Sequence, residues 1–432
     1  MRLIAWAVGL AATVCGAGAL EREPNEVFRE RRKALVDTVA GPVLLLGATS
    51  SEGQLGRSGF RQENSFYYLS GWNEPGAAML LVPEPYSETL FVPSPSPIHD
   101  AWTGPTLDPS SEEAHDQTGF AKVLPVDELE DAVKLALEGS RGLYTLMEPT
   151  PYGIGEPFRI RPNRDRVEEL APGVRLREVR KQIDEARLLK SAGELHLIQK
   201  AIEASIDGHR AAWRRIRPQI AEYQVFAAMS AAMIDKGALR VAYPPIVGAG
   251  ANSVTLHYSK GLGMLEAGDV VLMDVGGEYA HYAADITRTV PVSGRFTTRQ
   301  REIYAAGLDC QEKVIARAKP GMTLNGRPPK SLTQIAGDCF ERHEEGLSAY
   351  FLHSVGHHVG LDVHDPGEKA ELQPGMVITI EPGLYLADEG FGVRIEDMAI
   401  VTEDGVRVLP SELPKRIEEI EQAMGSGAGA SE

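Results

Sequence analysis

The stretch VVLMDVGGEYAHYAADITRTVPV, residues 270–292, places Asp274 and Asp285 in two apolar runs that are typical of β-strands. Two more carboxylates lie in similar runs downstream, Glu381 in VITIEPG and Glu396 in GVRIEDMAIV. An ionised carboxylate that is buried without a partner costs on the order of several kcal/mol. The nearby lysines and arginines are too few to neutralise all four acids. The pattern therefore predicts a site for divalent cations in the C-terminal half of the chain.

A histidine completes this predicted site. The run FLHSVGHHVGL, residues 351–361, is also strand-like, and successive side chains of a strand point to opposite faces. His353, Val355 and His357 then share one face, which selects His357 rather than His358 as a ligand. One imidazole among carboxylates suits Mn²⁺, Co²⁺ or Fe²⁺ better than a structural zinc, which prefers thiolates and imidazoles.

Bridging carboxylates allow two ions about 3.5–4 Å apart. Such a pair lowers the pKa of a bridging water and polarises a substrate carbonyl, which provides a nucleophile without a serine or cysteine. The sequence has no G-x-S-x-G motif, in agreement with this chemistry. We expect two divalent ions, with Mn²⁺ first and Co²⁺, Fe²⁺ or Zn²⁺ as alternatives.

Side chains around the acids are candidates for substrate contacts. Hydrolysis creates a tetrahedral oxyanion and a leaving amine, and both need hydrogen-bond donors. The histidines placed in strand-like segments near the acids are His257, His353 and His364. Arg394 shares a strand face with Glu396 and can balance an acid, whereas Asp397 points away and is expected to be a surface acid or one that supports the ligands. His281 and His99 have no such context and are expected on the surface.

Composition excludes several classes of partner. The chain has 432 residues, a formal charge of −17, 43% hydrophobic and 24% charged residues. These values are those of a globular protein with two domains. A nucleic acid or an anionic membrane needs a basic face, so we expect neither as a partner.

The first 19 residues resemble a signal peptide. Arg2 is followed by an apolar run, Leu3 to Val14, and by the cleavage pattern Ala17-Gly18-Ala19. We expect export to the periplasm or the medium and no stable membrane association after cleavage; an uncleaved anchor is the alternative. An oxidising compartment would permit a bridge between Cys310 and Cys339, but we expect buried thiols.

The rest of the chain divides near residue 183. Residues 20–182 alternate strands and helices and predict a small α/β domain. Residues 183–422 begin with one long helix over 183–215 and continue mainly as strands, and residues 423–432 are expected to be a disordered tail. No internal repeat is visible. The predicted strands of this second domain are 254–258, 270–275, 283–290, 350–355, 377–381 and 398–402, and its later helices are 298–318 and 331–344.

Several motifs, taken together and in this order, resemble the creatinase/aminopeptidase P/prolidase group of metallopeptidases. They are LHYSKG (256–261), MDVGGEYAHYAADITRTVPVSGRFT (273–297), FLHSVGHHVGLDVHDPG (351–367), LQPGMVITIEPGLY (372–385) and GVRIEDMAIVTEDG (392–405). The segment FRQENSFYYLSGWNEPGAAMLLVP, residues 60–83, looks like the small domain of aminopeptidase P. The resemblance implies an α/β (α+β) protein in which a pita-bread catalytic domain, with a curved and mostly antiparallel sheet flanked by helices, follows the small domain.

The resemblance also implies roles for residues. Asp274 would hold one ion, Asp285 and Glu396 would bridge both, and His357 and Glu381 would hold the other. Glu381 would also carry protons, Arg394 would pair with an acidic ligand, and the three histidines named above would line the substrate side. The run SVGHHVG departs from the group in the residues that flank the histidines, which affects the shape of the pocket.

The activity implied by the resemblance is that of a Xaa-Pro aminopeptidase, which releases the N-terminal residue from peptides with proline in second position. A Xaa-Pro dipeptidase is the close alternative. A creatinase-like amidinohydrolase, which works without metals, or an inactive peptide-binding module would have lost acidic ligands, and all of them are present here. We expect a homo-oligomer, a dimer or tetramer, which the small domain helps to build.

Overall fold

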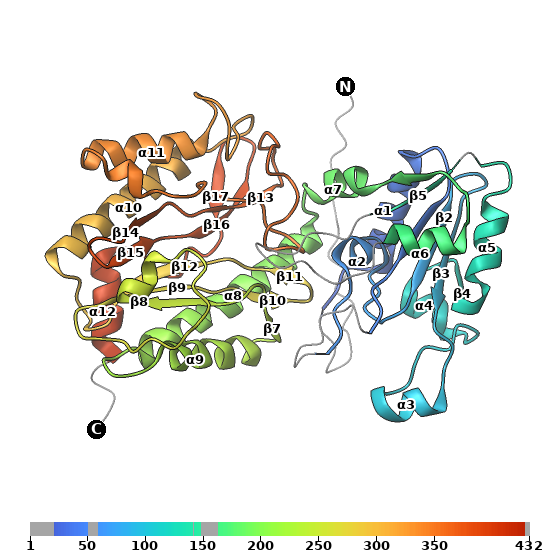
Figure 1. Cartoon of the computed structure of the whole chain (residues 1–432), viewed down its shortest axis with the longest axis horizontal. Coiled ribbons are helices and arrows are strands. Elements are labelled where there is room, and N and C mark those ends of the chain that lie inside the picture. The colour runs from blue at the N-terminus through green and yellow to red at the C-terminus, as the bar shows by residue number, and fades with distance from the viewer. Residues whose placement is uncertain (1–20, 51–58, 141, 148–162, 428–432) are drawn as a thin grey trace.

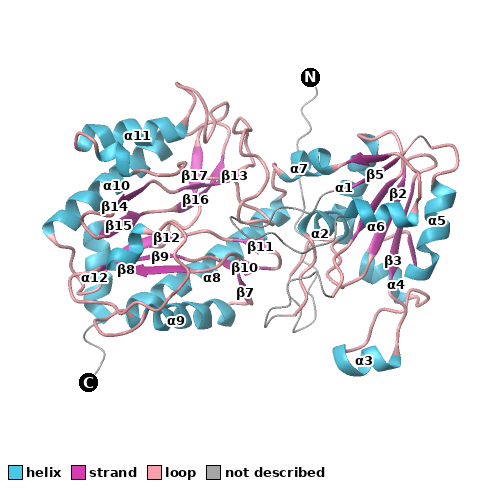
Figure 2. Ribbon diagram, in the orientation of Figure 1, coloured by secondary structure: helices cyan, strands magenta, loops and turns pink. Residues whose placement is uncertain are grey.

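A mixed six-stranded sheet forms the N-terminal lobe (Figures 1 and 2). This computed structural model describes residues 21–50, 59–140, 142–147 and 163–427, so the signal-like segment 1–19 lies outside the described residues. The strand order is β4-β3-β2-β1-β5-β6, with antiparallel pairs in the centre and parallel pairs at both sides. Its strands are β1 (Val43–Leu46), β2 (Ala78–Val82), β3 (Ser87–Val92), β4 (Lys122–Pro125), β5 (Leu143–Thr145) and β6 (Leu176–Glu178). The α/β prediction for this part of the chain is confirmed.

Both faces of this sheet are covered. Along β1, Val43 and Leu45 pack into the main core, whereas Leu44 and Leu46 pack into a second cluster on the opposite face. A strand that is buried on both sides reads as a continuous apolar run, as VLLL does. The covering helices are α1 (Asn25–Asp37), α2 (Asn64–Ser70), α4 (Glu113–Thr118), α5 (Leu129–Ala136) and α6 (Asn163–Leu170), while α3 (Pro97–Thr103) stands away from the sheet (Figure 1).

Two helices connect the lobes where the sequence predicted one. α7 (Arg180–Arg187) ends before Ser191, and α8 (Ala192–Arg215) begins after it. The hydroxyl of Ser191 accepts a hydrogen bond from Glu194 N, and Glu194 Oε2 accepts one from Ser191 N. This capping box starts a new helix and thereby ends the predicted continuous one.

In the C-terminal lobe the strands lie between two pairs of helices (Figure 1). α8 and α9 (Glu222–Asp235) lie on one side, and α10 (Thr298–Arg317) and α11 (Leu332–His343) on the other. All pairs of named strands in the described part of this lobe are antiparallel, but their hydrogen bonds form four small sheets rather than one continuous ladder. The strands are β7 (Arg240–Val241), β8 (Ile246–Ala249), β9 (Val270–Asp274), β10 (Gly277–Tyr279), β11 (Tyr282–Ala283), β12 (Thr287–Pro291), β13 (Val377–Ile380), β14 (Gly383–Leu386), β15 (Phe391–Arg394), β16 (Asp397–Val401) and β17 (Val406–Val408).

The breaks between these sheets reveal an internal duplication. In the first half, Asp274 ends β9, a hairpin of β10 and β11 follows, and Asp285 precedes β12. In the second half, Glu381 follows β13, a hairpin of β14 and β15 comes next, and Glu396 precedes β16. Each half thus contains, in this order, a helix pair, a strand, an acid, a hairpin, an acid and a strand, with β7, β8 and β17 as additions. The sequence did not reveal this repeat because the halves share an order of elements and not a residue pattern.

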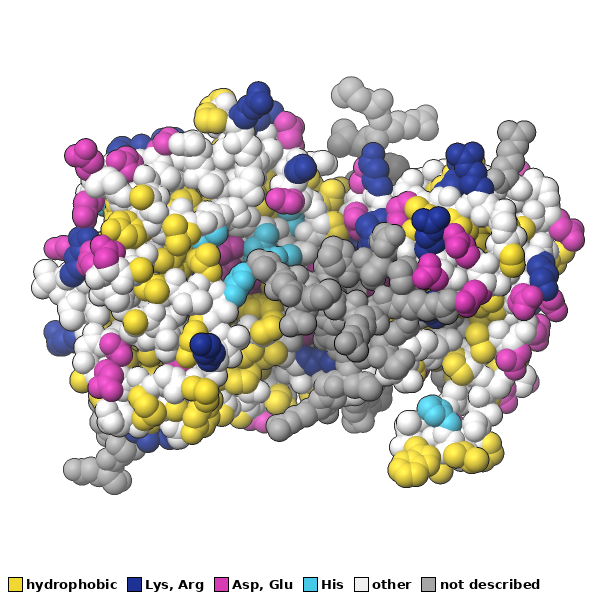
Figure 3. Space-filling model, in the orientation of Figure 1, with side chains coloured by type: hydrophobic (Ala, Val, Ile, Leu, Met, Phe, Trp, Pro, Cys, Tyr) yellow, Lys and Arg dark blue, Asp and Glu magenta, His cyan; other side chains and the backbone are white. Residues whose placement is uncertain are grey.

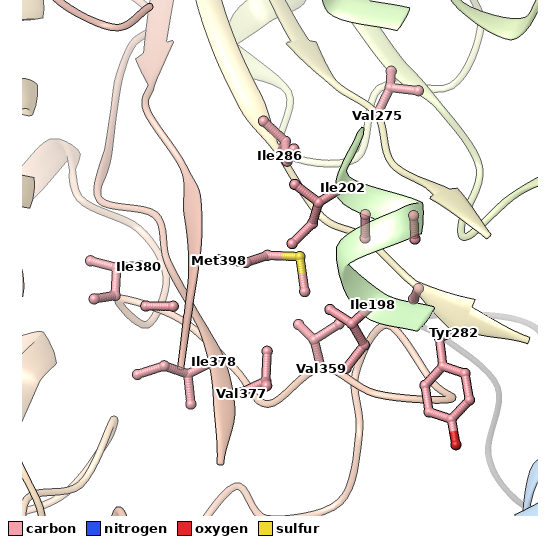
Figure 4. Packing of buried hydrophobic residues seen from close by; sticks show 14 of the residues in the cluster. Ile198, Ile202, Val275, Tyr282, Ile286, Val359, Val377, Ile378, Ile380 and Met398 are labelled. Carbon is pink, nitrogen blue, oxygen red and sulfur yellow. The ribbon is translucent and has the colours of Figure 1, made fainter. Parts of the chain in front are cut away.

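Helix α8 packs against strands of both halves (Figure 4). Ile198 and Ile202 point from α8 toward Ile286 of the first half and Met398 of the second. The sulfur of Met398 in turn accepts a hydrogen bond from Asp285 N at 3.2 Å. Full burial of an aliphatic side chain contributes about 1.5–3 kcal/mol, so this shared core holds the two halves together.

Some predicted strands are wrong. Residues 350–355 and 254–258 contain 3₁₀-helix and irregular chain instead, with η3 at Leu347–Tyr350 and η2 at Gly250–Val254. The pairing with β13 falls later, because Thr379 N donates to His357 O at 2.8 Å and Glu381 N to Val355 O at 2.8 Å. At Gly356 a Cβ atom would lie 2.1 Å from Thr379 O, so only glycine permits this close approach.

The predicted disordered tail begins too early. α12 (Ile417–Gly427) continues beyond residue 423, and Ile420 and Met424 are buried in the main core. Residues 428–432 lie outside the described residues.

The strand predicted over 283–290 is interrupted before β12, and β8, β14 and β15 were not predicted. No helix in the described part of the chain is long and apolar enough to cross a membrane.

Candidate metal centre

The five predicted ligands converge at the breaks between the sheets. Ligand atoms of Asp285, His357 and Glu396 lie within 4.8 Å of one another. His357 Nε2 lies 3.3 Å from Asp285 Oδ2 and 3.4 Å from Glu381 Oε1. Asp274 joins the group through the hydroxyl of Tyr243, which lies 2.5 Å from Asp274 Oδ1 and 2.6 Å from Asp285 Oδ1. His358 is buried and faces away, as the strand argument predicted.

The electrostatics of the centre call for added positive charge. Burial and the neighbouring carboxylates raise the pKa of Asp285 and of Glu396 well above their ordinary values. Burial also raises the pKa of Asp274, but Arg394, whose Nη2 lies 2.5 Å from Asp274 Oδ2, and the hydrogen bonds to this carboxylate, that of Tyr243 among them, together outweigh burial and lower the pKa. One guanidinium cannot balance four carboxylates at this depth. The donor set, oxygen-rich with one imidazole, fits divalent cations.

Tyr243 gives a second sign of the same charge deficit. Its hydroxyl lies within hydrogen-bond distance of two carboxylates but carries one proton. The hydroxyl can donate to only one of the two carboxylates. The short contact between its oxygen and the second carboxylate is stable only if that acid is protonated or a cation lies beside it. Tyr243 was not among the predicted site residues because it lies in AYPPIVG, which has no acid and no recognisable spacing to the motifs.

Arg394 connects Asp274 to the predicted substrate histidine His353 through hydrogen bonds. Its Nη1 donates to Tyr385 Oη at 2.6 Å, and Tyr385 Oη lies 2.7 Å from His353 Nε2. His353 Nδ1 lies 3.8 Å from Glu381 Oε2. A hydrogen-bonded chain therefore runs from Asp274 to His353. Tyr385, which lies inside the motif LQPGMVITIEPGLY, was another residue that the sequence analysis missed.

The other two predicted histidines lie on the open side of the centre. The ring of His364 lies 4.1 Å from that of His357, centroid to centroid, with the two planes tilted by 54°. Burial and the neighbouring histidines His357 and His257 lower the pKa of His364 to about 3, so its ring is neutral at ordinary pH. His257 is exposed. Figure 3 shows histidine side chains gathered on this face of the C-terminal lobe, near the junction of the lobes. Imidazoles so placed can form hydrogen bonds with a substrate.

The prediction of a surface position is wrong for His281, while His99 is exposed as expected. His281 is only 8% exposed and stacks on Tyr67 of the N-terminal lobe, with ring centroids 3.8 Å apart. Of the two alternatives for Asp397, a surface position is excluded, because the residue is buried and paired at 2.6 Å with both Arg288 and Lys415. The local sequence around Asp397 does not reveal these partners, because they lie on elements that are distant along the chain.

A second group of potential ligands, Asp309, Cys310, Cys339 and His343, lies between α10 and α11. The sulfur atoms of Cys310 and Cys339 form a disulfide, with Cα atoms 5.6 Å apart. The expectation of two free thiols is therefore wrong. The two residues face each other across packed helices, a relationship that cysteine spacing alone could not reveal.

Comparison with known proteins agrees with this geometry. Residues 196–403 match metallopeptidase family M24, and residues 28–144 match the aminopeptidase P N-terminal domain. A Xaa-Pro aminopeptidase of Haemophilus influenzae is 33% identical over 93% of this chain and 97% of its own length. The chain belongs to metallopeptidase family M24.

Other M24 relatives extend the match to whole structures. Human Xaa-Pro aminopeptidase 3 is 32% identical over 84% of this chain and 76% of its own length. The structure of Pseudomonas aeruginosa aminopeptidase PepP has a TM-score of 0.82 at 29% identity and covers 94% of this chain and 99% of that one. Escherichia coli aminopeptidase P with the inhibitor Pro-Leu has a TM-score of 0.81 at 28% identity, covering 94% and 100%. This M24 chain is therefore a metal-dependent hydrolase with the pita-bread fold.

Proposed function

We propose that this M24 enzyme is a Xaa-Pro aminopeptidase, which releases the N-terminal residue from peptides with proline in second position. The observation that carries the proposal is the convergence of Asp285, His357 and Glu396, whose ligand atoms lie within 4.8 Å of one another. The match of residues 28–144 to the aminopeptidase P N-terminal domain favours an aminopeptidase over a dipeptidase.

Each residue of the centre has a proposed role. Asp274 would hold one ion, His357 and Glu381 would hold the other, and Asp285 and Glu396 would be shared between them. When bound, such ions supply Lewis-acid polarisation of the scissile carbonyl and a water nucleophile at neutral pH. Arg394 keeps Asp274 ionised and oriented through their contact at 2.5 Å.

Proton movement falls to the protein side chains. Glu381 accepts the proton of the attacking water at its carboxylate and returns it to the leaving nitrogen of proline. His353 lies beside Glu381, with 3.8 Å between Nδ1 and Oε2, but its Nδ1 donates to Ser354 O at 2.7 Å, so it is a neighbour of the acid and does not carry the proton. His364 and His257 lie on the open side and orient the peptide by hydrogen bonds. A tertiary X–Pro amide has no N–H, and this arrangement does not require one.

The decisive experiment compares two substrates in the presence of Mn²⁺. The tripeptide Arg-Pro-Pro should be cleaved faster than the dipeptide Ala-Pro, with free arginine as the first product. Faster cleavage of the dipeptide would identify a Xaa-Pro dipeptidase instead. A peptide with alanine in second position is the control for proline specificity.

Mn²⁺ is the ion that we propose for the working enzyme. Oxygen-rich sites with one imidazole suit Mn²⁺, and Co²⁺, Fe²⁺ and Zn²⁺ are the alternatives. Metal analysis of enzyme purified without added metal, followed by reconstitution with each ion, tests this choice. Turnover that is highest with another ion at equal occupancy would overturn it.

We also propose that the protein is exported and assembles with copies of itself. The disulfide between Cys310 and Cys339 supports export, because such bonds persist in oxidising compartments. Cell fractionation and sequencing of the mature N-terminus, expected near Leu20, test export. Light scattering on the mature chain tests assembly, for which a dimer or tetramer is the expected result.

A further inference from the structure

A buried histidine of α8 holds together the two strands of the first half at their acids. His209 is fully buried, and its Nε2 lies 3.3 Å from Val275 O and 3.1 Å from Ile286 O. Val275 directly follows Asp274, and Ile286 directly follows Asp285. One imidazole nitrogen thus bonds to the backbone immediately after both aspartates.

The chemistry of these contacts fixes the state of the ring. Both partners of Nε2 are carbonyl oxygens, so Nε2 carries the proton and donates. Nδ1 is buried and has no hydrogen-bond partner in the described part of the chain. Burial, together with the charge of Arg288, lowers the pKa of His209 to about 4. The residue is therefore a neutral donor at ordinary pH and does not serve as a base.

A buried glutamine of α10 makes the same connection in the second half. Gln311 Nε2 donates to Ile380 O at 3.0 Å and to Ile395 O at 3.1 Å. Ile380 directly precedes Glu381, and Ile395 directly precedes Glu396. The amide is held in this orientation because its Oε1 accepts a hydrogen bond from Lys415 Nζ at 2.9 Å.

These contacts occur where the backbone ladder is interrupted. β9 and β12 are paired as far as Asp274 and Thr287, with one more backbone bond from Val275 N to Ile286 O at 3.2 Å, and β13 and β16 are paired as far as Ile380 and Asp397. Beyond these residues the chain leaves each ladder for a hairpin of another sheet, so the side-chain bonds lie at the last paired positions. Each half therefore has one fully buried side chain, from the first helix of its pair, that bonds to the ends of its two paired strands beside the acids. We propose that His209 and Gln311 are paired positioning residues, each of which sets the spacing of the two carboxylates of its own half. This inference rests on the proposed metal-binding roles of the acids.

The proposal assigns each residue to one ion. His209 supports the backbone of Asp274, the proposed ligand of the first ion alone, and Gln311 supports that of Glu381, a proposed ligand of the second. Of the proposed bridging acids, Asp285 belongs to the first half and Glu396 to the second. Loss of an outer partner of a metal ligand commonly weakens metal affinity by about 10- to 100-fold. We expect His209→Leu to weaken chiefly the first ion and Gln311→Met chiefly the second.

The test is calorimetric titration of the metal-free enzyme with Mn²⁺. His209→Leu should lower one of the two affinities by about 10- to 100-fold. Combined with Asp274→Asn, which removes the first ion, the same change should have little further effect, because interacting residues are not additive. Combined with Glu381→Gln, it should retain its full effect. Gln311→Met should retain its full effect in combination with Asp274→Asn and should have little further effect in combination with Glu381→Gln.

Matched variants separate positioning from folding. His209→Gln places an amide donor near the position of Nε2 and should restore the affinity, whereas His209→Asn is too short to reach and should not. His196→Leu, an exposed histidine of the same helix, and Gln334→Met, an exposed glutamine of α11, should bind both ions as the parent does. If His209→Leu fails to fold, the comparison of His209→Gln with His209→Asn decides.

Unchanged affinities for both ions in folded His209→Leu and Gln311→Met would overturn the proposal, as would equal weakening of both ions by each variant. Its failure differs from failure of the proposed peptidase activity. Metal binding is measured without substrate, so the titrations give a result even if the enzyme cleaves no Xaa-Pro peptide. Conversely, cleavage of Xaa-Pro peptides by the wild-type enzyme does not depend on how the His209 and Gln311 variants bind metal.

Discussion

Thr287 of β12 donates a hydrogen bond from Oγ1 to Glu396 Oε2 at 2.7 Å, which ties an acid of the second half to a strand of the first. The backbone makes the same connection, because Glu396 N donates to Thr287 O at 3.1 Å. The side chain and the main chain of one residue thus fix a proposed bridging ligand.

Thr287→Val should test the importance of this contact. The substitution keeps the shape of the side chain but removes the donor and leaves Glu396 with one partner fewer. We expect Mn²⁺ affinity to fall by about 10- to 100-fold, measured by titration of the metal-free enzyme. Thr289→Val on the same strand removes a buried hydroxyl that bonds to the Arg394 backbone and touches no acid, and it should have a smaller effect.

Asp285→Asn and His357→Ala should each abolish turnover and lower metal content. Asn cannot bridge two cations as a carboxylate does, and alanine removes the one imidazole of the proposed ligand set. Activity on Arg-Pro-Pro and elemental analysis of the same sample provide the measurements. His343→Ala, on α11 and outside the centre, is the control. Full turnover by either ligand variant would refute the assignment.

Arg187 should be essential for the junction of the lobes. It is buried, and Nη2 lies 2.6 Å from both Asp362 Oδ2 and Asp365 Oδ1. Removing one partner of a buried ion pair costs about 3–5 kcal/mol because the remaining charge is uncompensated. Arg187→Met should lower the free energy of unfolding by that amount in urea. Lys181→Met, on the exposed side of the same helix, should change it little.

Substrate turnover provides a second measurement for the same variant. Asp362 and Asp365 flank His364 in sequence, and Asn64 of the N-terminal lobe also donates to Asp362 Oδ1 at 2.5 Å. Disturbing this loop should therefore reduce kcat/KM for Xaa-Pro peptides even where the protein remains folded. An Arg187→Met enzyme with unchanged kcat/KM would show that the loop does not depend on the junction.

Acid should weaken the junction through Asp365. Burial raises its pKa, but Arg187 and Lys190 outweigh burial, and the net pKa lies below the ordinary value of 3.8. A depressed folded-state pKa contributes stability that is fully present above the unfolded value and is lost as the pH falls through the folded value. The difference in unfolding free energy between the parent and Asp365→Asn should be largest near neutral pH and should shrink below about pH 3.8. A constant difference across this range would contradict the prediction.

The disulfide should contribute measurably to stability. Cys310 and Cys339 are separated by 29 positions, and closing a loop of that size stabilises a fold by about 2–4 kcal/mol. Treatment with a dithiol should lower the denaturation midpoint of the parent protein. A Cys310→Ser/Cys339→Ser double variant should start at the lower midpoint and be insensitive to the dithiol. Equal midpoints for both proteins would show that the cross-link is dispensable.

Buried acids were the part of the site that the sequence predicted best. Asp274, Asp285, Glu381 and Glu396 stand out because charge in an apolar run has few explanations. His357 faces the acids and His358 does not, as alternation along a strand predicts, although residues 350–355 are not a strand. Side chains still alternate between two faces here, because the chain forms backbone hydrogen bonds with β13 from Val355 onward.

Residues that act through distant partners were not predictable. Tyr243, Tyr385 and His209 carry no local signal, because a tyrosine or histidine in an apolar segment most often belongs to the core. His281 failed for the same reason, since its stacking partner Tyr67 lies in the other lobe. The break between α7 and α8 was different, because the capping-box pattern that begins at Ser191 was present in the sequence.

The duplicated arrangement also sets the order of events during synthesis. Asp274 and its partner Arg394 are 120 positions apart, and each half brings only part of the ligand set. A ribosome must release nearly the whole polypeptide before any complete cation cage exists. Acquisition of the ions is therefore a late step of maturation, and the compartment in which folding finishes determines which metal the enzyme receives.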